Sequence, residues 1–116
     1  MISAIGNNVP ESFASLSNSK TGIGPINHLT TRYKDEFLAG EIKLSNQQLA
    51  EMVGDSNPAL NRNSYIAMLA AKEAVTNSGI DTKDGLRTGG ISSTTVAGMS
   101  KTELYYKELF EKDEHL

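Results

Sequence analysis

The sequence predicts a small α/β protein in which short extended segments alternate with helices. Three observations lead to this class. The chain has 116 residues, 38% hydrophobic and 22% charged, which is enough for one hydrophobic core but not for two. Residues 58–78 carry apolar and small side chains over a helix-length stretch, whereas residues 37–44 and 86–96 are short and apolar or β-branched. The expected order is strand, helix, extended piece, helix, strand and helix.

The first helix is expected to begin after a turn at residues 6–8. Residues 1–6 are a short apolar run, interpreted as a strand, which stops at the sequence Gly-Asn-Asn, a signal for a turn and a helix cap. Pro10 and Glu11 suit the first turn of the helix. The pattern predicts that this helix ends by residues 18–19.

A loop, a weak strand and a short helix are predicted for the middle of the chain. Two glycines and a proline within residues 20–26 exclude a continuous helix or a central strand there, so we expect an ordered loop or a set of turns. Residues 37–44 are apolar enough for a weak strand. Ser45 is expected to cap a helix over Gln47–Val53, which Gly54 ends.

The strongest predicted element is a long helix from Pro58 or Ala59 to Ser78, with Gly79 directly after its end. Its apolar and small-residue surface is wider than the stripe of an ordinary surface helix. We therefore expect other parts of the protein to cover most of its sides.

The last part of the sequence predicts a strand and a final helix. Residues 86–96 are rich in β-branched and small residues, which favours a strand that runs into a loop of Ser, Thr and Gly. The final helix is expected to begin within residues 97–100, where Ser100 and Glu103 have the spacing of a capping box.

Charge and composition exclude several classes of partner. The 11 basic and 14 acidic residues give a net charge of -3, and the basic residues are scattered, which favours neither nucleic acid nor an anionic membrane. No apolar run approaches the ~20 residues of a membrane span, and no signal peptide is visible, so we expect a cytoplasmic protein. The chain has no cysteine, which excludes disulfides, a thiolate nucleophile and cysteine-ligated metal.

No pattern of residues indicates a metal site or an acid–base pair. His28 lies in a polar segment and His115 among the last residues, and neither stands in a ligand pattern. Two pairs of neighbouring carboxylates are typical of a solvated surface. These pairs are Glu51 with Asp55 and Asp113 with Glu114. We therefore expect no metal and no cofactor.

Residues 88–98 are the one stretch where a strand, a small-residue loop and a helix N-terminus are predicted in succession, a geometry that can bind anions. The stretch lacks the Gly-Lys-Ser/Thr of a P-loop and the third glycine of the dinucleotide fingerprint. A ligand contact and a purely structural role both stay open. The residues alone thus lead to an α/β protein without an assigned activity.

Five short motifs follow one another over nearly the whole chain. They are Ser-Ala-Ile-Gly-Asn at 3–7, Ser-Lys-Thr-Gly-Ile-Gly-Pro-Ile at 19–26, Ala-Gly-Glu-Ile-Lys at 39–43, Ala-Ala-Lys-Glu-Ala at 70–74 with Ser-Gly-Ile at 78–80, and Arg-Thr-Gly at 87–89 leading to Ala-Gly-Met at 97–99. In type, order and spacing they resemble the N-terminal part of β-ketoacyl-acyl-carrier-protein synthases, the condensing enzymes of the thiolase-like superfamily. The sequence departs from that family's pattern at Ala4, at residues 60–61 and at residues 92–93.

The resemblance implies that residues 1–116 are a single N-terminal ketosynthase segment, an incomplete piece of a thiolase-like layered αβαβα fold. The family's enzymes are acyltransferases that move an acyl group from a thioester to a cysteine and condense it with malonyl-carrier protein. They serve the biosynthesis of fatty acids or of related polyketides and aryl polyenes. Their catalytic cysteine and two histidines lie beyond the matched segment, so we expect no catalytic residue in this truncated chain and no activity of the chain alone.

The resemblance also implies partners and one site residue. The parent protein would use an acyl carrier protein and acyl thioesters and would form a homodimer, with no nucleic acid and no membrane span. Val96 falls where the family often has an apolar residue that lines the fatty-acyl pocket, which makes it the candidate substrate-binding residue; a buried valine at a strand end explains it equally well. A second class of function stays open, that of a non-catalytic ketosynthase-like partner or interaction module.

Overall fold

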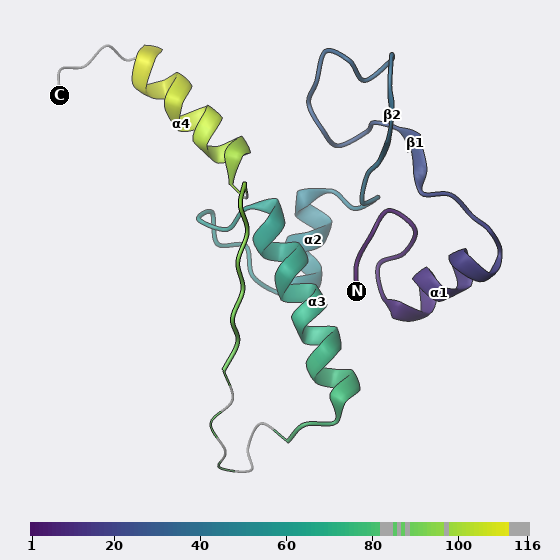
Figure 1. Ribbon diagram of the computed structural model, residues 1–116. Coiled ribbons are helices and arrows are strands. Elements are labelled where there is room, and N and C mark those ends of the chain that lie inside the picture. The colour runs from purple at the N-terminus through teal and green to yellow at the C-terminus, as the bar shows by residue number, and fades with distance from the viewer. Residues whose placement is uncertain (82–84, 86, 88, 97, 112–116) are drawn as a thin grey trace.

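The computed structural model describes residues 1–81, 85, 87, 89–96 and 98–111, which form a small mixed α/β protein (Figure 1). The predicted α/β class is confirmed in this coarse form. The described elements are four helices and one two-stranded sheet. They are α1 (Val9–Ser17), β1 (Ile23–Pro25), β2 (Leu38–Gly40), α2 (Asn46–Val53), α3 (Arg62–Ser78) and α4 (Met99–Glu111).

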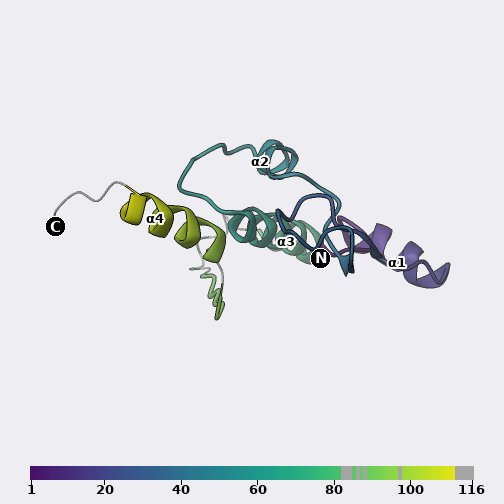
Figure 2. The ribbon, with the colours of Figure 1, turned by 90° about the horizontal axis from the view of Figure 1, so that it is seen from above.

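The elements spread into an open shape with a small core. α1 and α4 lie at opposite ends of the molecule in both views (Figures 1 and 2). The radius of gyration is 17.7 Å, whereas a compact chain of this length is expected to have about 13 Å. α2 packs against α3, and the buried hydrophobic residues among those described are Leu49 of α2 and Tyr65 of α3. Much apolar surface is therefore left uncovered.

Local signals set both ends of α1 as predicted. The side-chain oxygen of Asn8 accepts the backbone N–H of Glu11 at 2.8 Å, and the Glu11 carboxylate accepts the N–H of Asn7 at 2.8 Å. The strand expected over residues 1–6 is wrong, because the run turns back on itself and forms one isolated bridge between Ser3 and Gly6.

The sheet pairs β1 with β2 in antiparallel register, with Ile23 opposite Gly40. The predicted strand over residues 37–44 is confirmed only for its three residues in β2. Part of the predicted loop over residues 20–26 instead forms β1. Both strands lie at an edge of this sheet, a position that tolerates Pro25.

The capping prediction for α2 is confirmed. The Ser45 hydroxyl accepts the backbone N–H of Gln48 at 3.2 Å, and the Gln48 side chain accepts the N–H of Ser45 at 2.8 Å. Gly54 ends the helix in the left-handed conformation, with φ of 80°. The helix begins at Asn46, one residue before the predicted start.

α3 begins at Arg62, so the predicted start at Pro58 or Ala59 is wrong. The side-chain oxygen of Asn57 accepts the backbone N–H of Ala59 at 2.9 Å and holds residues 57–60 in a turn. Asn61 then supplies the cap, since its side-chain oxygen accepts the N–H of the residue three positions further on.

The C-terminal end of α3 is confirmed, with Gly79 in the left-handed conformation at φ of 65°. The expectation that most sides of this helix are covered is wrong. Only Tyr65 is buried, whereas Met68 is 40% exposed and Val75 46% exposed. The reason is that α2 is the one described element packed against α3.

The strand predicted over residues 86–96 is wrong for its described part, because residue 87 and residues 89–96 form no strand. Leu86 and Thr88 lie outside the described residues. A segment rich in β-branched residues forms a strand only beside another strand with which its backbone exchanges hydrogen bonds. None of the described strands runs beside this stretch.

α4 does not begin with the predicted capping box. Ser100 is the second residue of the helix, so it cannot serve as the cap. The carbonyl of Gly98 instead accepts the first backbone N–H groups, from Lys101 at 2.9 Å and Thr102 at 3.0 Å.

Candidate functional site

Two loops and the end of β2 meet around the methyl group of Ala4. A Cβ built on Gly22 would lie 2.7 Å from Ala4 Cβ and 2.8 Å from its carbonyl carbon, so the two backbones touch. A Cβ on Gly40 would lie 3.6 Å from the same methyl group. We call Ala4, Gly22 and Gly40 the Ala4 cluster. It joins three segments that are far apart in the sequence, namely residues 3–7, 19–26 and 39–43.

Gly6 fixes the same N-terminal turn against α1. A Cβ at Gly6 would lie 2.5 Å from the backbone nitrogen of Ser12, closer than any side chain allows. Ser12 is fully buried, and its hydroxyl has no hydrogen-bond partner among the described residues. The hydroxyl of Ser15 adds a bond of 2.7 Å to the carbonyl of Ile5. The turn and the helix therefore form one packed unit.

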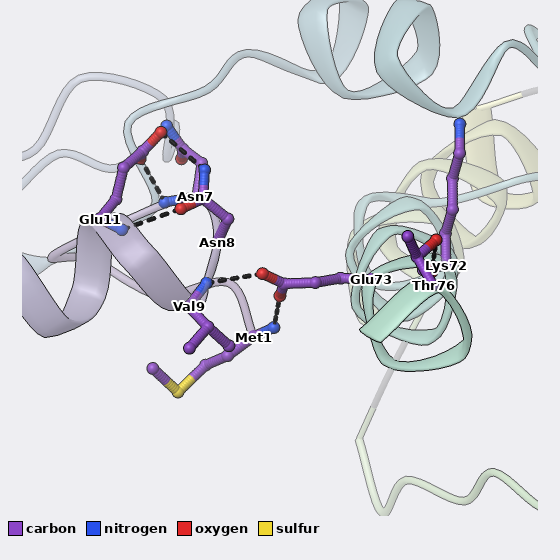
Figure 3. A network of polar contacts seen from close by, with 8 residues as sticks. All are labelled: Met1, Asn7, Asn8, Val9, Glu11, Lys72, Glu73 and Thr76. Atoms are coloured by element: carbon purple, nitrogen blue, oxygen red, sulfur yellow. Dashed lines mark hydrogen bonds and ion pairs between the residues drawn. The ribbon is translucent and has the colours of Figure 1, made fainter. Parts of the chain in front are cut away.

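Glu73 connects this unit to α3. Figure 3 shows its side chain extending from α3 toward Met1 and the start of α1. One carboxylate oxygen accepts the backbone N–H of Val9 at 2.6 Å, and the other pairs with the amino group of Met1. The bond with that amino group, and then the bond from Val9, lower the pKa of Glu73 below its ordinary value.

Arg62 ties the start of α3 to the segment between β2 and α2. Its guanidinium donates to the carbonyl oxygens of Leu44 at 2.8 Å and Ile42 at 2.9 Å, and to the side-chain oxygen of Asn46 at 3.0 Å. The fork of donors on arginine suits such a set of converging oxygens. Since Asn46 is the first residue of α2, this contact ties the start of α2 to the start of α3.

Glu41 holds the loop that follows β1. Its carboxylate accepts the backbone N–H groups of Asn27 at 2.8 Å, His28 at 3.0 Å and Leu29 at 2.7 Å. Partial burial raises the pKa of Glu41, but the three N–H groups and the neighbouring His28 together outweigh it. The net result is a pKa below the ordinary value of 4.5.

We expect the replacement Glu41→Gln to remove a pH-dependent part of the stability. A carboxylate whose pKa is lowered by folding stabilises the fold above its unfolded pKa, and this contribution is lost as the pH falls through the folded pKa. The difference in unfolding free energy between wild type and Glu41→Gln should therefore be largest near neutral pH and shrink below pH 4.5. Urea titrations at several pH values measure it. The exposed Glu36→Gln is the matched control, and an equal effect of both variants would contradict the role of Glu41.

A cavity of about 480 Å³ lies between α2, the start of α3 and the start of α4. Its described lining holds two cations, Arg62 and Lys101, and no carboxylate. Ser56 and Ser100 contribute hydroxyl groups, but no lining residue is a histidine or an acid that could activate them. Arg62 and Lys101 already donate to carbonyl oxygens of the chain, and the lining lacks a nucleophile with an adjacent base.

Val96, the predicted substrate-binding residue, lies in the stretch between α3 and α4. Its side chain is 71% exposed, and the described cavity does not include it among its lining residues. The place of Val96 in an acyl pocket stays a prediction.

Of the histidines and paired carboxylates, the structure describes His28, Glu51 and Asp55. His28 is exposed in the loop that Glu41 holds, while Glu51 accepts a bond of 3.0 Å from Gln47 and Asp55 one of 2.8 Å from the N–H of Asn57. Within the described residues, no group of three or more His, Asp and Glu could hold a metal ion. Residues 113–115, which include His115, Asp113 and Glu114, lie outside the described residues.

Sequence reasoning missed the three charged side chains that connect the elements, Arg62, Glu41 and Glu73. A cation in the first turn of a helix is unfavourable for the helix dipole, so Arg62 could have signalled an acceptor elsewhere in the protein. Glu41 interrupts an apolar segment, so it could likewise have signalled hydrogen-bond donors elsewhere in the protein. Nothing distinguishes Glu73 from a solvated acid on the Ala-rich helix.

Among the described residues, no helix combines the length and apolar character that crossing a membrane requires. Comparison with models of protein families, with curated proteins and with solved structures finds no match to this chain.

Proposed function

We propose that the chain is the N-terminal segment of a 3-oxoacyl-acyl-carrier-protein synthase. The observation that carries the proposal is the Ala4 cluster. Three of the five motifs that resemble this family, at residues 3–7, 19–26 and 39–43, lie beside one another there: Gly22 packs closely against Ala4, and Gly40 lies near the Ala4 methyl group. Motifs that are short and weak alone support the proposal more strongly when their residues touch.

The glycines of these motifs give a second line of support. Gly6 and Gly22 stand where an added Cβ would lie less than 3 Å from neighbouring backbone atoms. A glycine required by close packing is a better marker of a shared loop structure than a glycine in open space. Two of the motifs thus contain a glycine that the packing requires.

In the proposed role this segment supports the reaction without supplying the reacting groups. The apolar side chains of α3 that stand exposed, among them Met68 and Val75, would pack against the remaining layers of an αβαβα fold. The cysteine that accepts the acyl group, the two histidines and much of the carrier-protein contact would come from the parts that complete those layers.

A hybrid enzyme tests the proposal. Residues 1–116 replace the corresponding segment of an active β-ketoacyl synthase, and condensation of an acyl thioester with labelled malonyl-carrier protein is measured. We expect turnover by the hybrid. We expect none by the 116-residue chain alone, because thioester exchange needs a thiolate and the chain has no cysteine.

A hybrid that is soluble and folded but inactive would contradict the proposal. If, in addition, the chain alone bound an active ketosynthase and changed the length of its products, the second function class, a non-catalytic partner, would replace it. The two results are distinguishable because the second requires no covalent fusion.

A further inference from the structure

The cavity between α2, α3 and α4 brings together two cations that are far apart in the sequence. Arg62 of α3 and Lys101 of α4 both line it, and both residues are partly buried. Arg62 donates to two carbonyl oxygens and one amide oxygen, and Lys101 donates to the carbonyl oxygen of Pro58. All of these acceptors are neutral, and within the described part of the chain neither cation pairs with a carboxylate. Their two positive charges are therefore not compensated by an ion pair.

The carboxylates that are nearest to the lining residues in the sequence have other partners or another place. Glu51 accepts a bond of 3.0 Å from the side chain of Gln47, and Asp55 accepts one of 2.8 Å from the backbone N–H of Asn57. Glu103 lines a separate groove on α4. None of these three acids belongs to the described lining of the cavity, so positive charge dominates there.

The lining also offers neutral hydrogen-bond donors. Besides the two cations, it carries the amide groups of Asn46 and Asn61 and the hydroxyl groups of Ser56 and Ser100. The side-chain oxygen of Asn46 accepts from Arg62, and that of Asn61 accepts the backbone N–H of the residue three positions further on. The amide NH₂ groups are left as donors. Charged and neutral donors thus converge on one space.

Apolar side chains form the rest of the lining. They are Ala50, Leu60, Tyr65 and Leu104. Tyr65 is buried in the core, which makes this part of the cavity a firm wall. The cavity volume of about 480 Å³ lies in the range of about 300–1,000 Å³ that small-molecule sites occupy.

We propose that this cavity binds a phosphate monoester with a small apolar organic group. Such an ester carries nearly two negative charges at neutral pH, which two cations without acidic partners neutralise. Its three terminal oxygens accept hydrogen bonds, which the guanidinium, ammonium, amide and hydroxyl groups supply. The organic group would lie against Leu60, Tyr65 and Leu104. This inference goes beyond the proposed function, since it rests on this cavity alone.

Titration of the full chain with phenyl phosphate tests the proposal, followed by two-dimensional NMR of the backbone amide groups at neutral pH and constant ionic strength. We expect saturable shifts at Ser56, Arg62 and Lys101, with a Kd below about 1 mM. Phenyl sulfate has the same shape but one negative charge, so it is the matched control ligand and should bind about tenfold more weakly. Inorganic phosphate, which lacks the ring, should also bind more weakly than phenyl phosphate.

A pair of lysine variants tests whether the cavity itself is the site. Lys101→Gln removes one cation from the lining and should weaken phenyl phosphate binding about tenfold. Lys107→Gln makes the same change of charge on the same helix, but outside the cavity, and should leave the Kd unchanged. Because Lys101 also holds the carbonyl of Pro58, Ser56→Ala serves as a second variant that keeps both cations and should weaken binding by a smaller factor.

Three results would overturn the proposal. The first is the absence of a saturable shift in wild type up to about 10 mM phenyl phosphate. The second is equal affinity for phenyl phosphate and phenyl sulfate, and the third is an equal loss of affinity in Lys101→Gln and Lys107→Gln, which would show attraction by the net charge of the chain.

Discussion

Replacing Gly22 by alanine is expected to destabilise the folded chain by about 1–3 kcal/mol. The added Cβ would lie 2.7 Å from the Ala4 methyl group and 2.8 and 2.9 Å from its carbonyl carbon and oxygen. Two of these neighbours are backbone atoms, so a loop of the Ala4 cluster must move to accept the methyl group. Urea unfolding followed by circular dichroism measures the change.

Gly24→Ala is the matched control in the same segment. Its added Cβ would have Lys43 Nζ as its nearest neighbour, at 3.8 Å, which is ordinary contact with the end of a flexible side chain. Both substitutions restrict the unfolded chain equally, by about 0.4–1 kcal/mol, so their difference reports the contact with Ala4. Equal stability of the two variants would show that the loops do not pack as described.

Replacing Val96 by phenylalanine in the hybrid synthase should slow the reaction of long acyl primers by about tenfold or more. If Val96 lines the acyl pocket, the larger ring fills volume that a long chain needs, whereas short primers do not reach that depth. The measurement is the rate of condensation against primer length, corrected for the folded fraction of each enzyme.

The alternative role of Val96, a buried valine at a strand end, predicts a different profile. Overpacking would then cost about 1–3 kcal/mol of stability and lower the rate for every primer alike. An unchanged preference for primer length would show that Val96 has an ordinary structural role and does not line the acyl pocket. In the 116-residue chain, where its side chain is 71% exposed, the same substitution should leave stability unchanged.

The parts of the fold that depend on neighbouring residues could be predicted from the sequence. Helix caps are of this kind. Ser45 exchanges hydrogen bonds with Gln48 three residues later, and Gly54 ends the helix because glycine readily adopts a positive φ. The start of α3 could not be predicted because Asn57 and Asn61 are both suitable caps. Only the structure shows that Asn57 holds a turn and that Asn61 caps the helix.

The parts that depend on distant residues could not be predicted in the same way. β1 forms because it pairs with β2, with Ile23 opposite Gly40. Neither segment taken alone predicts this pairing. Residues 89–96 have a strand-like composition, but none of the described strands lies beside them. Their composition therefore predicts a strand that does not form. The contacts of Arg62 with Ile42 and Leu44 likewise join segments whose proximity is set by the fold.

The central claim is that residues 3–7, 19–26 and 39–43 pack around Ala4. The most direct measurement of it is the nuclear Overhauser effect from the Ala4 methyl group. The described contacts predict strong cross-peaks to the α protons of Gly22 and weaker ones to those of Gly40, in a chain whose helices are formed. Loss of the cross-peaks between Ala4 and Gly40 in Gly22→Ala but not in Gly24→Ala would agree with the close packing. Helical protein without a cross-peak between Ala4 and Gly22 would contradict the Ala4 cluster and remove the main support for the proposed function.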